Sequence, residues 1–220
     1  MASSDRRFGT DEADWSEKKE IPKAIIASVE REIASSLRVK EAFLRECAAP
    51  WAGICEAVAG RLAHGGKVLL FGNGGSAGDA EHIAAEVVGR YQRERRALPA
   101  LALATNGCTL TALANDYGYD SVFALQVEAF GTPADVAIGI STSGNSLNVL
   151  GGLRAAHKVG MLRVAFTGKV GGKAFKMATL SLRVPSDVAA RIQECRILAG
   201  HVLSGNCEHF LCAGPRAVSR

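Results

Sequence analysis

The chain has 220 residues, of which 48% are hydrophobic, 22% are charged and only 6% are aromatic. A chain of this length can bury a core without disulfide bonds. Together with the composition, this excludes collagen-like, mucin-like and fully disordered proteins. Lys and Arg number 26 against 22 Asp and Glu, and so small and scattered an excess does not predict nucleic-acid binding.

The first 23 residues carry eleven charges and no apolar segment of the kind that forms a signal peptide. The six cysteines are spread along the chain without a CxxC pair, and no apolar run reaches the roughly 18 residues of a membrane span. We therefore expect reduced thiols in a soluble, cytoplasmic protein that does not contact membranes.

Residues 1–20 are polar and mixed in charge, and they predict a disordered or loosely docked tail. Apolar side chains at three- and four-residue steps then predict a helix from Ile21, and a second helix is expected between Pro50 and His64. These two helices would serve packing or oligomerisation. We expect one domain over residues 21–212, with a second short tail over 213–220.

After the helical pair the sequence alternates between short apolar runs and amphipathic segments. The predicted strands are Lys67–Phe71, Ala100–Ala104, Asp135–Ile140, Leu162–Thr167 and Thr179–Val184. The predicted helices are Ala77–Tyr91, Thr109–Asn115, Ser121–Phe130, Leu147–Val159, Gly172–Met177 and Val188–Phe210. This alternation predicts an α/β fold in three layers, with a mostly parallel five-stranded sheet and helices on both faces.

Two loops at predicted strand ends are rich in glycine and hydroxyl groups. Asn73, Gly74, Gly75 and Ser76 follow the first strand, and Ser141–Ser146 (STSGNS) follows the third. Such loops before helices offer N–H groups, hydroxyls and a positive dipole end to an oxyanion, most simply a sugar phosphate. The alternative is ordinary helix capping. Neither loop has the spacing of a dinucleotide or nucleotide-phosphate fingerprint.

Ionisable side chains on two predicted helices could meet in one cleft. His82 and Glu86 are four residues apart on the helix after the first loop, and Gln193 and His201 are eight apart on the last helix. Two imidazoles, a carboxylate and an amide oxygen would suit a borderline divalent metal such as zinc. A surface polar pair and a core histidine are the alternatives. His64, His157 and His209 are expected at the surface or in helix caps.

Two further features have both a functional and a structural interpretation. Asn115 and Asp116 precede Tyr117-Gly118, where a loop carboxylate could orient sugar hydroxyls or simply form a turn. A dense basic run is typical of a solvated helix end, although Arg90 could contact an anionic substrate or a neighbouring subunit. The run consists of Arg90, Arg93, Arg95 and Arg96.

Together these motifs resemble the phosphoheptose isomerases of the sugar-isomerase (SIS) superfamily. The resemblance extends in order from about Ile21 to Phe210. It rests on the segments Leu70–Ser76, Asp79 with His82 and Glu86, Gly89–Tyr91, Ala114–Gly118, Gly139–Ser146, Thr167-Gly168, and Arg191–Glu194 with His201. It implies an SIS-type sandwich preceded by N-terminal helices.

The resemblance implies conversion of sedoheptulose 7-phosphate to D-glycero-D-manno-heptose 7-phosphate. This is the first step towards nucleotide-activated heptose for lipopolysaccharide core and other glycans. It also implies a cytoplasmic homotetramer with active sites between subunits and one zinc ion per subunit. The implied zinc ligands are His82, Glu86, Gln193 and His201. The implied substrate contacts are Asn73, Gly74, Gly75, Ser76, Glu86, Arg90, Asn115, Asp116, Ser141, Thr142, Ser143, Ser146 and Gln193.

Ketose–aldose isomerisation moves a proton between C1 and C2 through an enediol, which needs a base and an acid partner. We assign Glu86 as the base and His201 as its acid/base partner, with zinc as a Lewis acid. Either these ligands leave the metal during turnover, or one of them is only a ligand.

The alternatives are an isomerase for another sugar phosphate and a non-catalytic SIS protein that binds a sugar phosphate or a replication initiator. The initiator-binding group looks to lack the full histidine and glutamate set, so Glu86 and His201 favour catalysis. Some family members carry an acidic residue just before Arg-Ile-Gln-Glu, where this chain has Ala189 and Ala190.

Overall fold

The computed structural model describes residues 21–212, so both predicted tails lie outside the described residues. The chain divides into two compact units, residues 1–34 and 35–220. The described part of the first unit contains the start of helix α1 (Lys23–Ala63). There Ile25, Val29 and Ile33 are more than half exposed, so this segment presents an unpacked apolar stripe within the unit.

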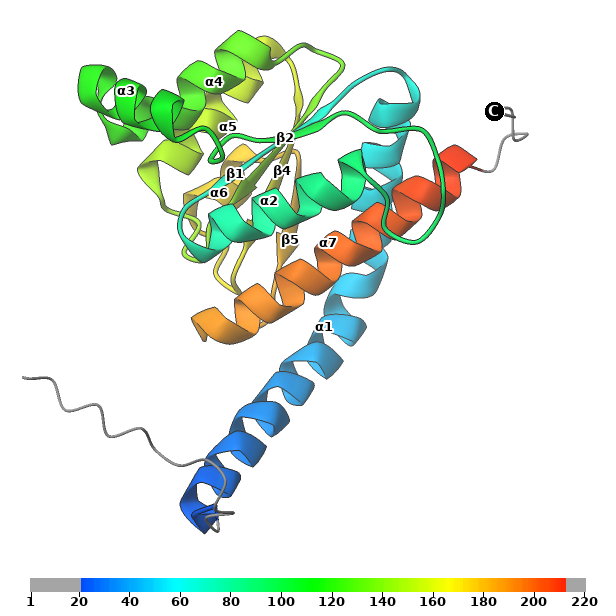
Figure 1. Cartoon of the computed structure of the whole chain (residues 1–220), viewed down its shortest axis with the longest axis vertical. Coiled ribbons are helices and arrows are strands. Elements are labelled where there is room, and N and C mark those ends of the chain that lie inside the picture. The colour runs from blue at the N-terminus through cyan, green and yellow to red at the C-terminus, as the bar shows by residue number, and fades with distance from the viewer. Residues whose placement is uncertain (1–20, 213–220) are drawn as a thin grey trace, which may run out of the picture. The chain divides into compact units, whose positions relative to one another are not determined.

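The second unit is built on a five-stranded sheet in which every pairing is parallel (Figure 1). The strand order is β2-β1-β3-β4-β5. Because the chain winds outward in opposite directions from β1 and β3, the topological switch point lies between these two strands. The strands are β1 (Val68–Gly72), β2 (Ala100–Ala102), β3 (Val136–Ile140), β4 (Leu162–Thr167) and β5 (Leu180–Arg183).

Helices cover both faces of the sheet, as predicted, because alternate residues of each strand point to opposite sides. Val68 and Leu70 of β1 belong to a core with residues of α1, α2 and α7, whereas Leu69 and Phe71 belong to a second core with residues of α4, α5 and α6. The remaining helices are α2 (Gly75–Val88), α3 (Gly107–Tyr117), η1 (Tyr119–Ser121), α4 (Val122–Phe130), α5 (Leu147–Val159), α6 (Gly172–Met177) and α7 (Ala189–Cys212).

The predicted pair of N-terminal helices is wrong, because α1 continues through Pro50 as one helix. Proline inside a helix costs about 3 kcal/mol. Here, however, Trp51 continues the buried stripe begun by Phe43 and Cys47, and its ring meets Phe166 edge-on at 5.2 Å. Each large apolar side chain buried along this stripe contributes about 1.5–3 kcal/mol, which together outweighs the proline penalty.

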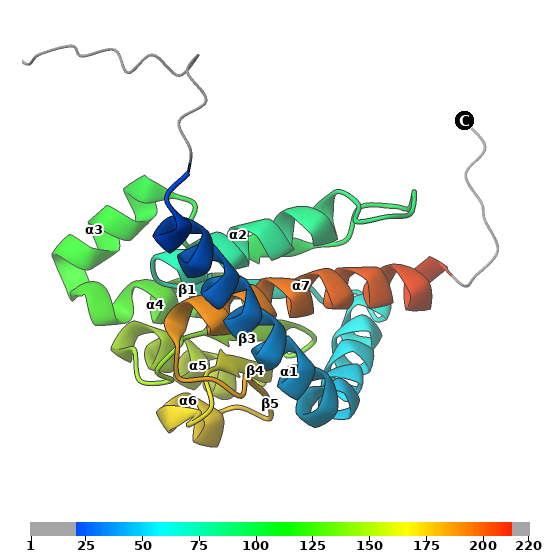
Figure 2. The ribbon, with the colours of Figure 1, turned by 90° about the horizontal axis from the view of Figure 1, so that it is seen from below.

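Helices α2 and α7 lie side by side on one face of the sheet, in the views of both Figure 1 and Figure 2. The two helices approach closely at Gly200, where an added Cβ would lie 2.4 Å from Cγ1 of Ile83. Gly200 directly precedes His201, and Ile83 directly follows His82. A residue without a side chain therefore brings the two histidine-bearing helices together.

The five cysteines whose side chains the structure describes are free thiols, and four of these are buried: Cys47, Cys55, Cys195 and Cys207. Burial raises the pKa of the Cys55 and Cys207 thiols to about 12, so these groups behave as core residues. Among the described residues, no helix is both long and apolar enough to cross a membrane.

Candidate active site

The two glycine- and hydroxyl-rich loops meet at the switch point of the sheet. The loop Asn73–Ser76 follows β1 and the loop Ser141–Ser146 follows β3, and these strands are paired so that Gly72 lies opposite Ile140. Gly74 has φ 53°, which an L side chain rarely adopts, so the first loop requires glycine there. The two loops therefore lie next to each other at this edge of the sheet.

A cavity of about 590 Å³ opens between these loops. Its polar lining has the donors that an oxyanion needs, and the Oγ atoms of Ser141 and Ser146 lie 2.9 Å apart. The cavity is lined by Asn73, Ser76, Ile140, Ser141, Thr142, Ser143, Asn145, Ser146, Gly168, Lys169, Val170, Ser186, Asp187, Ile192 and Gln193.

A reciprocal pair of amides ties the two loops together. The side chains of Asn73 and Asn148 each donate to the other's oxygen, at 2.9 and 2.8 Å, and the Tyr119 hydroxyl donates to Asn73 at 3.1 Å. The side chain of Asn73 is therefore committed to positioning the loop. Sequence reasoning missed Asn148, although an amide on the first turn of a helix after a ligand loop is a usable signal.

Beneath the second loop lies a buried ion pair between helices. Arg196 of α7 is fully buried, and its Nη2 is 3.2 Å from Oδ2 of Asp79 on α2. Burial raises the pKa of Asp79, and the charge and hydrogen bonding of Arg196 oppose that rise. Arg196 also donates to Oγ1 of Thr142 at 3.2 Å. Because a guanidinium only donates, the Thr142 hydroxyl accepts this bond and keeps its own proton for a ligand.

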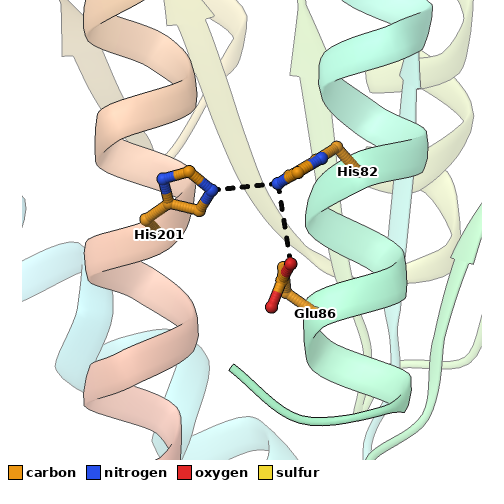
Figure 3. A group of neighbouring side chains, drawn as sticks. All are labelled: His82, Glu86 and His201. Atoms are coloured by element: carbon orange, nitrogen blue, oxygen red, sulfur yellow. Dashed lines mark hydrogen bonds and ion pairs between the residues drawn. The ribbon is translucent and has the colours of Figure 1, made fainter. Parts of the chain in front are cut away.

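The predicted ionisable cluster forms between α2 and α7. Nε2 of His82 lies 2.9 Å from Nε2 of His201 and 3.6 Å from Oε1 of Glu86 (Figure 3). The three groups offer ligand atoms that all lie within 4.8 Å of one another. Figure 3 shows His82 and Glu86 projecting from α2 towards His201 on α7. His82 and Glu86 therefore form the i, i+4 pair expected from their spacing, and His201 of α7 lies beside that pair.

The fourth predicted ligand, Gln193, lies in the second turn of α7 and approaches Gly75, the first residue of α2. Its Nε2 is 2.6 Å from the position that a Cβ on Gly75 would occupy. Any side chain at position 75 would therefore require this amide to move. Gln193 lines the cavity and precedes His201 by eight residues on α7.

The donor set fits a divalent metal. Two ligands of a tetrahedral zinc with bonds of 2.0–2.1 Å lie about 3.3 Å apart, and the separations from His82 to its two partners fall on either side of this value. Imidazole and carboxylate are ligands that zinc accepts. The Nε2 atoms of both histidines also point towards each other, an arrangement that a shared cation would stabilise.

Three other predicted site residues lie away from the cavity lining. Asn115 and Asp116 belong to the last turn of α3 rather than to a loop, and they bond each other at 2.8 Å. Arg90 is exposed and pairs with Glu94 at 3.1 Å. The basic run is not a helix end, because α2 stops at Val88 and the run lies in the following loop.

Comparison with known proteins extends over most of the chain. A family model for the SIS domain matches residues 33–168. A phosphoheptose isomerase from Aquifex aeolicus is 50% identical over 188 residues, covering 86% of this chain and 98% of that protein. One from Paramagnetospirillum magneticum is 51% identical over 177 residues, covering 80% and 91%. The structure of phosphoheptose isomerase GmhA from Neisseria gonorrhoeae matches with a TM-score of 0.80 at 41% identity, covering 84% and 99%.

Proposed function

Because the chain belongs to the phosphoheptose isomerase family of SIS-domain proteins and is an aldose–ketose isomerase of heptose biosynthesis, we propose that it converts sedoheptulose 7-phosphate to D-glycero-D-manno-heptose 7-phosphate. One observation carries this proposal: an oxyanion cavity and a cluster of proton-transferring groups lie along the same helix, α2. From Gly75 to His82 the helix rises about 10 Å, a distance that a linear seven-carbon sugar phosphate can span.

The cavity between the loops would hold the phosphate. The hydroxyls of Ser141, Thr142, Ser143 and Ser146 supply donors, and the start of α2 adds N–H groups and dipole charge. The buried charge of Arg196 beneath Thr142 favours an anion above it. Binding energy from this remote group positions the reacting end of the sugar.

The reacting end would lie at the ionisable cluster. Glu86 is the base that moves the proton between C1 and C2, and His201 moves the proton between the two oxygens. His82 and Glu86 share one face of α2, and His201 faces them from α7, so the two proton carriers flank the same space. The side chains are partly open to solvent, 48% for His82 and 25% for Glu86.

We propose zinc, one per subunit, as the cofactor held by His82, Glu86 and His201, with Gln193 as the fourth ligand. Zinc bound there would supply Lewis-acid polarisation of the substrate's carbonyl oxygen. Either Glu86 and His201 leave the metal while they carry protons, or one of them serves only as a ligand. Arg90, Asn115 and Asp116, which lie away from the cavity lining, would contact parts of the substrate that extend beyond the cavity.

We also propose a cytoplasmic homotetramer whose product enters nucleotide-activated heptose synthesis for lipopolysaccharide core. The exposed apolar side chains of Ile25, Ile26, Val29 and Ile33 in the first unit support assembly, because contiguous apolar stripes mark association surfaces. A partner surface there would bury them.

Substrate preference tests this function. The purified protein is incubated with pentose, hexose and heptose ketose phosphates, and kcat/KM is measured for each by aldose formation. We expect sedoheptulose 7-phosphate to give the highest value by at least tenfold. Equal or better turnover of a shorter sugar phosphate would contradict the heptose assignment and keep the isomerase. A folded protein that binds the sugar phosphate without turnover would contradict both.

A further inference from the structure

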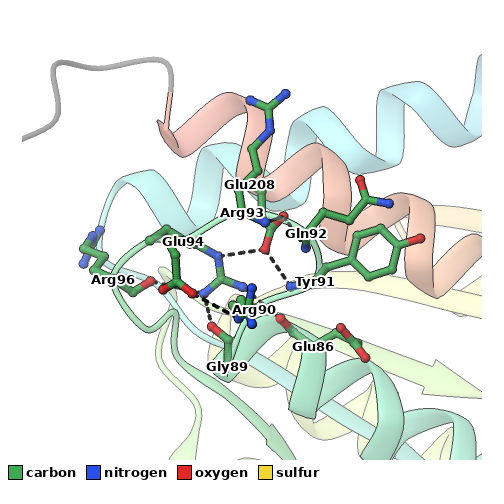
Figure 4. Close-up of polar contacts among 10 residues, drawn as sticks. Glu86, Gly89, Arg90, Tyr91, Gln92, Arg93, Glu94, Arg96 and Glu208 are labelled. Carbon is green, nitrogen blue, oxygen red and sulfur yellow. Dashed lines mark hydrogen bonds and ion pairs between the residues drawn. The ribbon is translucent and has the colours of Figure 1, made fainter.

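A buried carboxylate lies on α7 two turns beyond His201. Glu208 is seven residues after His201, so the two side chains share nearly the same helix face. Glu208 is only 1% exposed, and its carboxylate accepts backbone N–H bonds from Tyr91, Gln92 and Arg93 at 2.7, 3.0 and 3.0 Å (Figure 4). A single side chain of α7 thus fixes three consecutive amides of the loop that follows α2.

A buried guanidinium fixes the other end of that loop. Nε of Arg95 is 3.5 Å from Oε1 of Glu208, and both side chains are at most 3% exposed. Arg95 also donates to the carbonyls of Glu86 and Gly89, at 2.8 and 2.9 Å. These carbonyls belong to the C-terminal end of α2, where cationic side chains are favoured. Glu208 and Arg95 together therefore link α7 to the turn of α2 that carries Glu86.

The amide held most closely by Glu208 belongs to Tyr91, whose ring stacks on His201. The two rings are nearly parallel, at 14°, with centroids 5.4 Å apart. His82 meets the same imidazole edge-on, at 66° and 5.1 Å. His201 therefore has an aromatic ring against its face and the His82 ring against its edge.

We propose that Glu208 is a positioning residue for the ionisable cluster: by fixing the backbone of Tyr91, it holds the Tyr91 ring on His201 and so aims Nε2 of His201 at His82 and Glu86. The inference deepens the proposed function, since it concerns the same metal site. Residues that orient ligating histidines from outside the ligand set affect metal affinity by about 10–100-fold when removed.

The competing interpretation is that Glu208 only anchors the loop. In that case its loss would lower stability and leave the orientation of His201 unchanged. Glu94 provides a matched control, because it is a glutamate of the same loop whose carboxylate is exposed and paired only with Arg90 in the part of the chain that the structure describes.

The first measurement reports the environment of the His201 imidazole in the metal-free protein. Imidazole NMR signals of the metal-free protein are recorded for wild type, Glu208→Gln, Tyr91→Leu and Glu94→Gln, with the His201 signal assigned by its loss in His201→Gln. We expect Glu208→Gln and Tyr91→Leu to shift the His201 signals in the same direction, because the first displaces the Tyr91 ring from His201 and the second removes it. We expect Glu94→Gln to leave them in place.

The second measurement is zinc affinity by competition with a chromophoric chelator. We expect at least tenfold weaker binding in Glu208→Gln and Tyr91→Leu, and less than twofold change in Tyr91→Phe and Glu94→Gln. If Glu208 acts through Tyr91, the double variant Glu208→Gln/Tyr91→Leu binds zinc no more weakly than the weaker single variant.

Unchanged His201 signals in a folded Glu208→Gln protein would overturn the proposal. If that variant does not fold, unchanged signals and unchanged zinc affinity in Tyr91→Leu would overturn it instead. If the variants show the expected ring shifts and the wild-type protein binds no zinc, the result would contradict the metal site of the proposed function while supporting the positioning role.

Discussion

The oxyanion cavity and the ionisable cluster are built on the same helix by different means. The cavity is formed by loops at the ends of two paired strands, and the Asn73–Asn148 pair locks these loops together. The cluster depends on how closely α2 and α7 approach, with His82 and His201 partly exposed between them. Strand pairing therefore positions the residues of the cavity. Helix packing and the loop after α2 position the residues of the ionisable cluster.

The largest expected effect separates chemistry from phosphate binding. Glu86→Gln should lower kcat by about 10²–10⁴-fold, the usual contribution of general acid–base catalysis, while the affinity for inorganic phosphate in the cavity stays within twofold. Steady-state kinetics and phosphate titration check this. Glu81→Gln, an exposed glutamate on the same helix, is the control and should keep full activity. Near-normal turnover of the Glu86 variant would remove it as the base.

Acid pH should weaken the stabilisation that the ionised Glu208 carboxylate provides to the loop beside the ionisable cluster. Burial opposes ionisation of Glu208, but hydrogen bonds from Tyr91, Gln92 and Arg93 outweigh it, so the pKa of Glu208 lies below its ordinary value of 4.5. The folded state therefore binds this proton less readily than the unfolded state. The stabilisation is complete above pH 4.5 and is lost as the pH falls below it.

Glu208→Gln tests this dependence through the free energy of unfolding in urea. At pH 7 we expect a loss of about 3 kcal/mol, because a buried charge that accepts several hydrogen bonds is removed. The difference from wild type should shrink steadily between pH 4.5 and pH 3. A difference that stays constant over this range would contradict a charged Glu208 in the folded protein.

Thr142→Val should damage the cavity and spare the cluster. The variant loses the hydroxyl proton that points to a ligand, and a hydrogen bond to a charged group is worth about 1.5–3 kcal/mol. We expect KM for the sugar phosphate to rise about 10–100-fold, with zinc affinity unchanged. Serine at position 142 restores the hydroxyl and should recover most of the affinity. A loss of zinc affinity in Thr142→Val would mean that the two regions are coupled.

The smallest effect concerns the distance between helices. In Gly200→Ala the new methyl group would meet Cγ1 of Ile83 at 2.4 Å, so that side chain or α7 must move. We expect zinc affinity to fall about tenfold, a change of roughly 1.4 kcal/mol, while phosphate affinity is retained. The double variant Gly200→Ala/Ile83→Val makes room and should recover part of the zinc affinity. Without that recovery, the close approach would not be what positions His201.

The sequence predicted the loops of the cavity more completely than the packing of the helices that carry the ionisable cluster, because only the loops depend on local signals. Strand ends, glycines and capping serines are local signals, so both loops and the bounds of α5, β4 and α6 were predicted residue by residue. The i, i+4 spacing also placed His82 beside Glu86. Helix-to-helix geometry is not local, and nothing near Gly200 in the chain indicates that it meets Ile83 of α2.

The errors have the same origin. Pro50 is a local signal for a break, and the buried stripe on α1 overrides it through tertiary packing. Arg95 belongs to a run that indicates a solvated surface, yet it is buried because Glu208, 113 residues later, pairs with it. Asn115 and Asp116 have turn composition, but α3 continues through both.

The most direct test of the account is turnover of sedoheptulose 7-phosphate by the purified protein as its metal content is changed. Aldose formation is followed by NMR for the zinc-loaded protein, after complete chelation and after zinc is restored. The account predicts product with zinc, loss of turnover on chelation and full recovery on restoration, with one zinc bound per chain. Turnover that survives complete metal removal, or no product from folded zinc-loaded protein, would contradict it.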